Sequence, residues 1–273
     1  MFSKVFKYDF KFVFRFWWIF ALITLGLSVV GGFLLRSIAA MAEAGIENFL
    51  ASFLGMLGIM GVIIALSVFP FVGAIANLVR YYKNFFSDEG YLTFTLPVSR
   101  ATLLNSKVLC AFLFGFMSTV VLILDLFFFL IIGVGNTFPD FQEVVMGVPR
   151  IWSAWLTIDV ITIPFLLIMS SLASICMTQL SITIGSVISK RHKVLTGIGI
   201  YILFTTAMSF IQQLISFLTL NPLLEGSLYF HELGDSTAAL TLYLLVLTLF
   251  YTAVAVSTYF VNLHCIKHKL NLA

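Results

Sequence analysis

Six apolar runs, each at least 20 residues long, constrain this chain more than any other feature of its sequence. An α-helix of about 20 mostly apolar residues crosses the hydrocarbon core of a bilayer. We therefore predict an all-α integral membrane protein, with one transmembrane domain over residues 1–273. The runs cover approximately residues 16–35, 54–79, 108–133, 153–189, 194–217 and 238–263.

The composition excludes most other classes of protein. The chain is 61% hydrophobic and 10% charged, whereas soluble domains are roughly 45–50% apolar and about 25% charged. Disordered proteins have low hydrophobicity, so that class is excluded too. Three cysteines leave at least one unpaired, which argues against a disulfide scaffold. A net charge of +3 is small, and we predict no nucleic-acid partner.

The basic residues predict the orientation of the chain, because cytoplasmic loops are enriched in Lys and Arg. On one side of the predicted membrane domain, the only basic residues are Arg36 and Arg150. Both termini are therefore predicted to be cytoplasmic, in a multi-pass protein of the cell membrane. The opposite, cytoplasmic side carries Lys4, Lys7, Lys11, Arg15, Arg80, Lys83, Arg100, Lys107, Lys190, Arg191, Lys193, Lys267 and Lys269.

Residues 1–15 predict an amphipathic helix at the inner membrane surface. Its cations, which are Lys4, Lys7, Lys11 and Arg15, recur at helical spacing. Phe2, Val5, Phe6, Phe10 and Val13 face largely away from them, and we expect this apolar face in the acyl boundary. The alternative is a charged flank that only directs insertion of the first span.

Two segments predict irregular structure on the outer side. The fourth run is too long for one span, and Pro164 is expected to bend it, which makes residues 152–163 an outer segment with Trp152 and Trp155 at the interface. Residues 218–237 are half apolar, and predict either a surface-lying or a re-entrant helix.

Polar and small residues within the spans mark further candidate sites. Asp125 and Asp159 are candidate intramembrane polar sites, because an ionisable group in hydrocarbon is costly. We expect Asp159 near the outer interface, whereas Asp125 is either functional or partnered. Small residues allow the second span to approach another helix, in this chain or a second copy. They are Ala51, Gly55, Gly58, Gly61 and Ala65.

No catalytic motif is present, so we predict no enzyme activity on this chain. The sequence contains no G-x-x-x-x-G-K-[ST] loop, no G-x-S-x-G turn and no H-E-x-x-H helix. His264, Cys265 and His268 lack the further ligands of a zinc site, and are read instead as part of a basic tail.

Residues 81–107 form the most informative connection. Ser87 and Asp88 are expected to cap a short helix over 87–95, which Pro97 ends. Ser99 is expected to cap the next helix, with Arg100 and Lys107 as anchors at the inner surface. We predict that exposed aromatic residues contact a soluble partner, or alternatively lie among the headgroups. They are Phe85, Phe86, Tyr91 and Phe94.

The run F-S-D-E-G-Y-L-T-F-T-L-P-V-S-R at 86–100, followed by L-L-x-S-K at 103–107, resembles the first cytoplasmic loop of bacterial ABC transporter permeases of the type-2 exporter class. The resemblance implies a coupling helix that inserts into a separate ATPase subunit. It also implies a second permease copy or a related permease, with ATP and Mg bound by the ATPase and no cofactor on this chain. The residues of the implied coupling helix are Ser87, Asp88, Glu89, Gly90, Tyr91, Leu92, Thr93 and Phe94.

Two other functions stay open from the sequence. One is a gradient-driven secondary transporter or channel that uses Asp125. The other is a membrane assembly subunit that transports nothing. The substrate, and the choice between homodimer and heterodimer, do not follow from the sequence.

Overall fold

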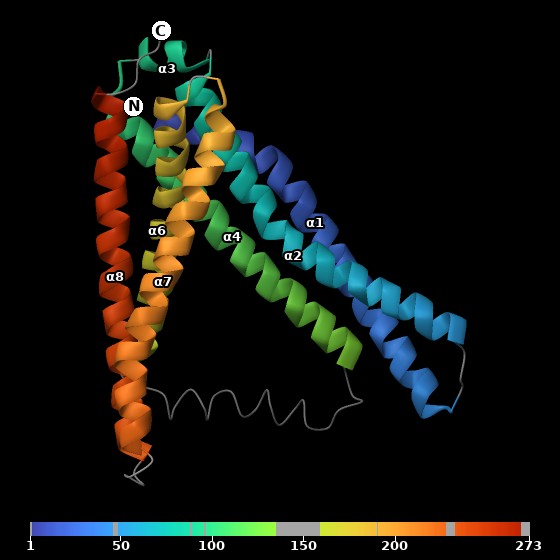
Figure 1. Ribbon diagram of the computed structural model, residues 1–273. Coiled ribbons are helices and arrows are strands. Elements are labelled where there is room, and N and C mark those ends of the chain that lie inside the picture. The colour runs from blue at the N-terminus through green and yellow to red at the C-terminus, as the bar shows by residue number, and fades with distance from the viewer. Residues whose placement is uncertain are drawn as a thin grey trace. The chain divides into compact units, whose positions relative to one another are not determined.

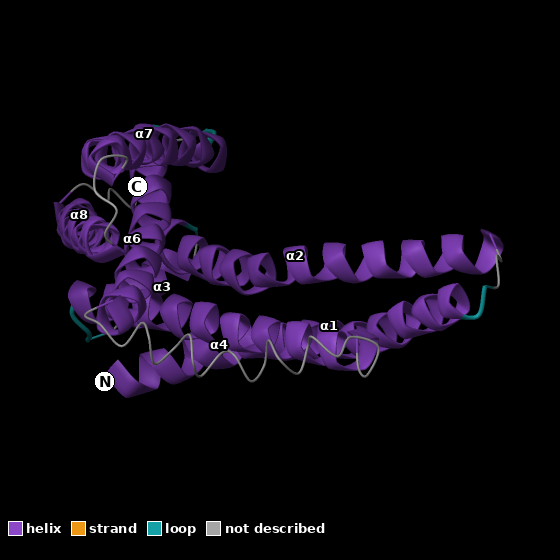
Figure 2. Cartoon of the chain, turned by 90° about the horizontal axis from the view of Figure 1, so that it is seen from below, coloured by secondary structure: helices purple, strands orange, loops and turns teal. Residues whose placement is uncertain are grey.

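The computed structural model describes residues 2–45, 49–87, 89–95, 97–134, 159–189, 191–227 and 233–268. In these ranges all regular secondary structure is helical (Figures 1 and 2). The helices are α1 (Phe2–Glu43), α2 (Phe49–Phe86), α3 (Glu89–Thr95), α4 (Arg100–Val134), α6 (Asp159–Ile188), α7 (Lys193–Ser227) and α8 (Leu233–His268). All except α3 are long and apolar enough to cross a membrane. The predicted all-α, multi-pass membrane protein is confirmed.

The helices extend beyond the apolar runs that predicted them. α1 has 42 residues and α2 has 38. The runs were bounded by charged residues, but Lys and Arg are good helix formers, so the helices continue through them. α6 likewise passes through Pro164 without a change of element, and α7 continues to Ser227. Where the structure describes the two predicted outer segments, residues 159–163 belong to α6, residues 218–227 to α7 and residues 233–237 to α8. Their place on the outer side stays a prediction. Trp152, Trp155 and residues 228–232 lie outside the described residues.

The chain divides into two compact units. The first contains Ser3–Arg80 and the part of α4 from Leu109, and the second contains Tyr81–Val108 with α6, α7 and α8. The connection that carries α3 therefore belongs with the last three long helices.

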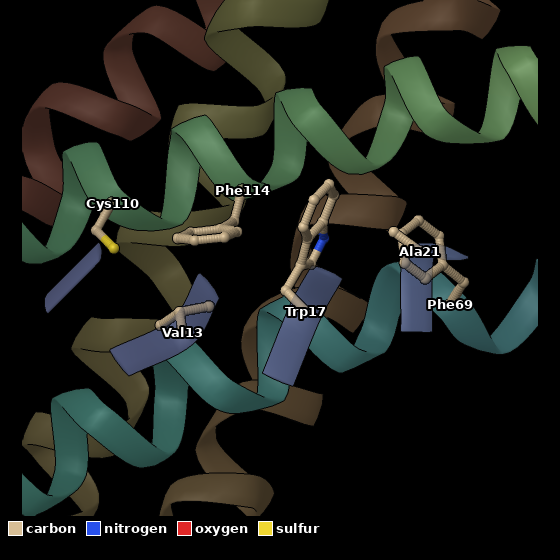
Figure 3. Close-up of a cluster of buried hydrophobic side chains, with 6 residues drawn as sticks. All are labelled: Val13, Trp17, Ala21, Phe69, Cys110 and Phe114. Atoms are coloured by element: carbon tan, nitrogen blue, oxygen red, sulfur yellow. The ribbon is translucent and has the colours of Figure 1, made fainter. Parts of the chain in front are cut away.

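Aromatic packing between α1, α2 and α4 forms the core of the first unit. Trp17 of α1 lies between Phe69 of α2 and Phe114 of α4, with each pair of ring centroids 5.8 Å apart. Its indole N–H donates a hydrogen bond to Ser118 Oγ at 2.8 Å. Figure 3 shows this core, whose members are Val13, Trp17, Ala21, Phe69, Cys110 and Phe114.

The predicted interfacial helix is not a separate element, because α1 is continuous from Phe2. Its apolar face packs against protein: Val13 is fully buried, and the Phe10 ring lies 4.9 Å from that of Phe114. The prediction that this face lies in the acyl boundary is therefore wrong for Phe10 and Val13, whereas Phe2 is 38% exposed and for it the prediction stays open. Its cations do remain exposed, namely Lys4, Lys7, Lys11 and Arg15.

The small residues of α2 contact a helix of the same chain. A side chain at Gly55 would collide with Ile38 of α1, and one at Gly58 would collide with Leu34. At these two positions, the helix that approaches α2 closely therefore belongs to this chain and not to a second copy.

A buried hydrogen-bond network in the second unit joins the end of α2 to α6 and α8. In this unit α6, α7 and α8 lie side by side (Figure 1). Thr183 Oγ1 of α6 lies 2.8 Å from Tyr81 Oη of α2 and donates to Asn262 Oδ1 of α8 at 2.7 Å. Tyr81 also donates to Asn262 at 3.2 Å. Since all three side chains are at most 1% exposed, this network fixes the end of α2 on α6 and α8.

The closest approach of α6 and α7 allows a direct test of the fold. A methyl group at Gly185 would lie 2.5 Å from the backbone nitrogen of Gly197, and backbone cannot rotate away. Gly185→Ala should therefore separate the two helices and destabilise the protein by about 1–3 kcal/mol. Gly199→Ala is the matched control, because nothing lies within 4 Å of the added methyl group. Thermal unfolding in detergent should show a lower midpoint for the first variant only; equal midpoints would contradict this packing.

Candidate functional site

The short helix predicted at 87–95 is present as α3, Glu89–Thr95. The Gly90 N–H donates to the Ser87 carbonyl at 2.7 Å and begins the helix. Gly90 is buried, and a side chain there would meet the carbonyl oxygen of Phe85 at 3.0 Å. Glycine at this position therefore lets α3 lie directly against the end of α2.

The predicted caps of this region are only partly found. The Ser87 hydroxyl donates to the Lys83 carbonyl at 2.6 Å, so it completes the end of α2 and does not cap α3 through its side chain. Ser99 does cap α4, because its Oγ accepts the Thr102 N–H at 3.2 Å. Asp88 lies outside the described residues.

Three exposed residues of α3, which are Glu89, Tyr91 and Leu92, form what we call the α3 outer face. Tyr91 is 67% exposed and Leu92 is 68% exposed. These are large apolar side chains on a polar loop, a composition that is typical of a protein interface. The α3 outer face is therefore the candidate docking surface.

Two aromatic residues assigned to the docking surface are instead part of the interior. Phe85 and Phe86 are buried, and Phe94 is only partly exposed. The Phe85 ring lies 5.0 Å from Tyr81 and 5.6 Å from Phe94. The prediction that Phe85 and Phe86 are exposed is wrong. α2 continues through both residues, and their side chains are buried in the interior of the second unit.

Arg100 connects α3 to the end of α8. Its Nη1 donates hydrogen bonds to the carbonyls of Ile266 at 2.8 Å and Lys267 at 2.6 Å. These carbonyls belong to the last turn of α8, where no intrahelical donor is available. The same guanidinium lies over the Phe94 ring of α3, 5.4 Å from its centroid. Arg100 thus links α3 and α8, a role that the sequence did not predict. Its predicted place at the inner membrane surface stays a prediction.

Two further lysines lie near the predicted cytoplasmic ends of the spans. Lys107 is only 4% exposed, so the prediction of an exposed surface anchor is wrong for this residue. Lys193, at the start of α7, directs its ammonium toward the Phe86 carbonyl at 3.4 Å. Through Arg100 and Lys193, the segment that carries α3 contacts both α8 and α7. A force applied to α3 would therefore act on these two spans.

Asp125 is the buried acid of the first unit. Its side chain is fully buried in α4, and its Oδ1 accepts a hydrogen bond from Ser28 Oγ of α1 at 3.3 Å. Its Oδ2 has no hydrogen-bond partner among the described residues. This acid is thus a polar group with unused acceptor capacity inside the helix bundle. The side chain of Asp159 lies outside the described residues.

The first unit also contains an ion pair that the sequence did not predict. Asp9 is 2% exposed, and its Oδ1 lies 3.2 Å from Arg80 Nε of α2. The guanidinium of Arg80 also lies over the Phe12 ring, 4.9 Å from its centroid. An acid within a strongly basic segment was the available signal, because such an acid has many potential partners. The missed Tyr81, Thr183 and Asn262 network carries no comparable signal in the sequence.

Comparison with known proteins gives no match to a family model, to a curated protein or to a solved structure. Within the described residues, no group of three or more His, Cys, Asp or Glu could hold a metal ion.

Proposed function

We propose that this chain is the permease subunit of an ATP-driven ABC transporter of the type-2 exporter class, in a bacterial cell membrane with both termini cytoplasmic. The supporting observation is the α3 outer face, which exposes Tyr91 and Leu92 while the base of α3 is held on α8 through Arg100. A docking helix must combine these two properties, an exposed surface for the motor and a firm connection to the spans.

In this proposal ATP and Mg bind separate ATPase subunits, and this chain is not an enzyme. Closure of the ATPase pair moves α3 as a rigid body, and the movement passes to α8 through Arg100 and to α7 through Lys193. A second copy or a related permease forms the other half of the pathway.

Purification of the tagged chain from its native membrane in mild detergent tests this function. We expect a soluble ATPase to co-purify and to hydrolyse ATP after reconstitution into proteoliposomes. A chain that is stable, folded and free of any ATPase would contradict the proposal. A complex with neither ATPase activity nor transport would instead indicate the third function, an assembly subunit.

Asp125 supports the second candidate function, a gradient-driven transporter or channel, because its Oδ2 has no partner among the described residues. The two functions predict different results for Asp125→Asn. As an ABC permease, the variant should keep ATPase co-purification and ATP hydrolysis within about twofold, because Asn can still accept the Ser28 hydrogen bond. As a proton-coupled transporter, it should lose proton uptake into proteoliposomes under an imposed pH gradient, measured with a trapped pH-sensitive dye.

A further inference from the structure

An open depression of about 600 Å³ lies at the turn between α6 and α7, where these two candidate spans meet. Seven residues line it, and all belong to the second unit. They are Tyr82, Arg191, His192, Lys193, Val194, Leu195 and Ile198.

The polar half of this depression carries donors suited to an anion. Arg191 and His192 are exposed, and neither side chain has a hydrogen-bond or ion-pair partner among the described residues. Lys193 adds a third basic side chain, though its ammonium also approaches the Phe86 carbonyl. An arginine fork binds phosphate oxygens in pairs, and the histidine ring donates a hydrogen bond in either protonation state.

The backbone adds to this donor set. The turn is fixed by the His192 N–H, which donates to Ser189 Oγ at 3.0 Å, and α7 then begins at Lys193. The first N–H groups of a helix have no intrahelical acceptor and carry a partial positive charge. The lining residues Val194 and Leu195 stand in this first turn.

The other half of the depression is apolar and faces outward. Val194, Leu195 and Ile198 are each more than half exposed. They belong to the first two turns of a helix that is long and apolar enough to span the membrane. A soluble anion would leave these side chains in water, whereas a molecule with both a phosphate and acyl chains would cover both halves.

We propose that this depression is a binding site for an anionic phospholipid, with the phosphate on Arg191, His192 and the start of α7, and an acyl chain along Leu195 and Ile198. Basic depressions between spans have the charge to select anionic over zwitterionic headgroups. None of the lining residues belongs to the α3 outer face, and the proposal does not depend on the proposed transport function.

Native mass spectrometry of the full chain tests the site, after equilibration with mixed phosphatidylglycerol and phosphatidylcholine micelles. We expect wild-type protein to retain phosphatidylglycerol preferentially. Arg191→Gln with His192→Gln should weaken that retention by about fivefold or more, since a cation at a membrane surface contributes about that factor. Arg191→Lys should keep most of the preference. Because both side chains are exposed and unpartnered, the variants should unfold at the wild-type temperature.

Two controls distinguish a lipid site at this turn from a diffuse charge effect and from a free-anion site. Lys4→Gln with Lys7→Gln removes two exposed cations from α1; an equal loss of retention would show a diffuse charge effect and overturn the proposal. Competition by inorganic phosphate or glycerol phosphate, at concentrations comparable to the lipid, would show a free-anion site and also overturn it. A double variant at Arg191 and His192 that keeps its lipid but loses a soluble partner protein would assign the turn to protein docking instead.

Discussion

Replacing Tyr91 with alanine should release the ATPase subunits from this protein while leaving its fold unchanged. Tyr91 is 67% exposed, so its loss creates no cavity, whereas a tyrosine at the centre of an interface commonly contributes about 2 kcal/mol or more to binding. We expect binding to weaken by roughly 30-fold. The amount of ATPase that co-purifies with the tagged chain measures the effect.

The matched control is Tyr8→Ala, because Tyr8 is a similarly exposed tyrosine, at 71%, on α1. This control should keep the full amount of ATPase and the wild-type unfolding temperature. Glu89→Arg, on the same α3 outer face, should weaken binding as Tyr91→Ala does. If both α3 variants retained the ATPase and its normal hydrolysis rate, the proposed docking surface would be wrong.

Replacing Arg100 with glutamine should have a different outcome, in which the ATPase still binds but no longer drives the permease. Arg100 makes two charge-assisted hydrogen bonds to the last turn of α8, and each such bond contributes about 1.5–3 kcal/mol. Their loss should lower the unfolding temperature and disconnect α3 from α8. The ATPase should then co-purify normally, while its stimulation by the permease in proteoliposomes falls severalfold.

Arg100→Lys separates the charge from the geometry of this link. A lysine keeps the positive charge near the negative end of the α8 dipole but lacks the planar fork. We expect intermediate stability and partial stimulation. Loss of ATPase binding in Arg100→Gln, or normal stimulation in that variant, would show that Arg100 does not transmit movement between α3 and α8.

The sequence predicted the elements whose signals are local. Long apolar runs specify spans regardless of what surrounds them, and all six are present. α3 was predicted from turn and capping residues over a short segment, and Ser99 caps α4 as expected. These signals depend on backbone propensity and chain length, which need no knowledge of tertiary packing.

What the sequence could not predict is which apolar face meets protein and which meets lipid. Both surroundings are apolar, so the hydrophobic pattern does not distinguish them. Phe10 and Val13 were therefore assigned to lipid although they pack in the core of the first unit. Phe85 was assigned to a docking surface, yet it is fully buried.

Charged residues have long-range partners that the sequence does not reveal. Arg100 and Lys107 were both interpreted from their net charge and their position at the end of a span. Arg100 also binds the carbonyls of α8, more than 160 residues away in sequence, and Lys107 is buried. Asp9 was not assigned at all, although it pairs with Arg80. Such long-range partners follow only from the packing of the helices.

Site-directed cross-linking from position 91 in native membranes is the most direct test of the central claim, that α3 docks on an ATPase. A photoreactive amino acid replaces Tyr91, and the same substitution at Tyr8 serves as the control. The account predicts a cross-linked product from position 91 alone, in which peptide sequencing identifies a subunit with a nucleotide-binding G-x-x-x-x-G-K-[ST] loop. Cross-links from position 91 only to lipid, or only to another copy of this chain, would contradict it.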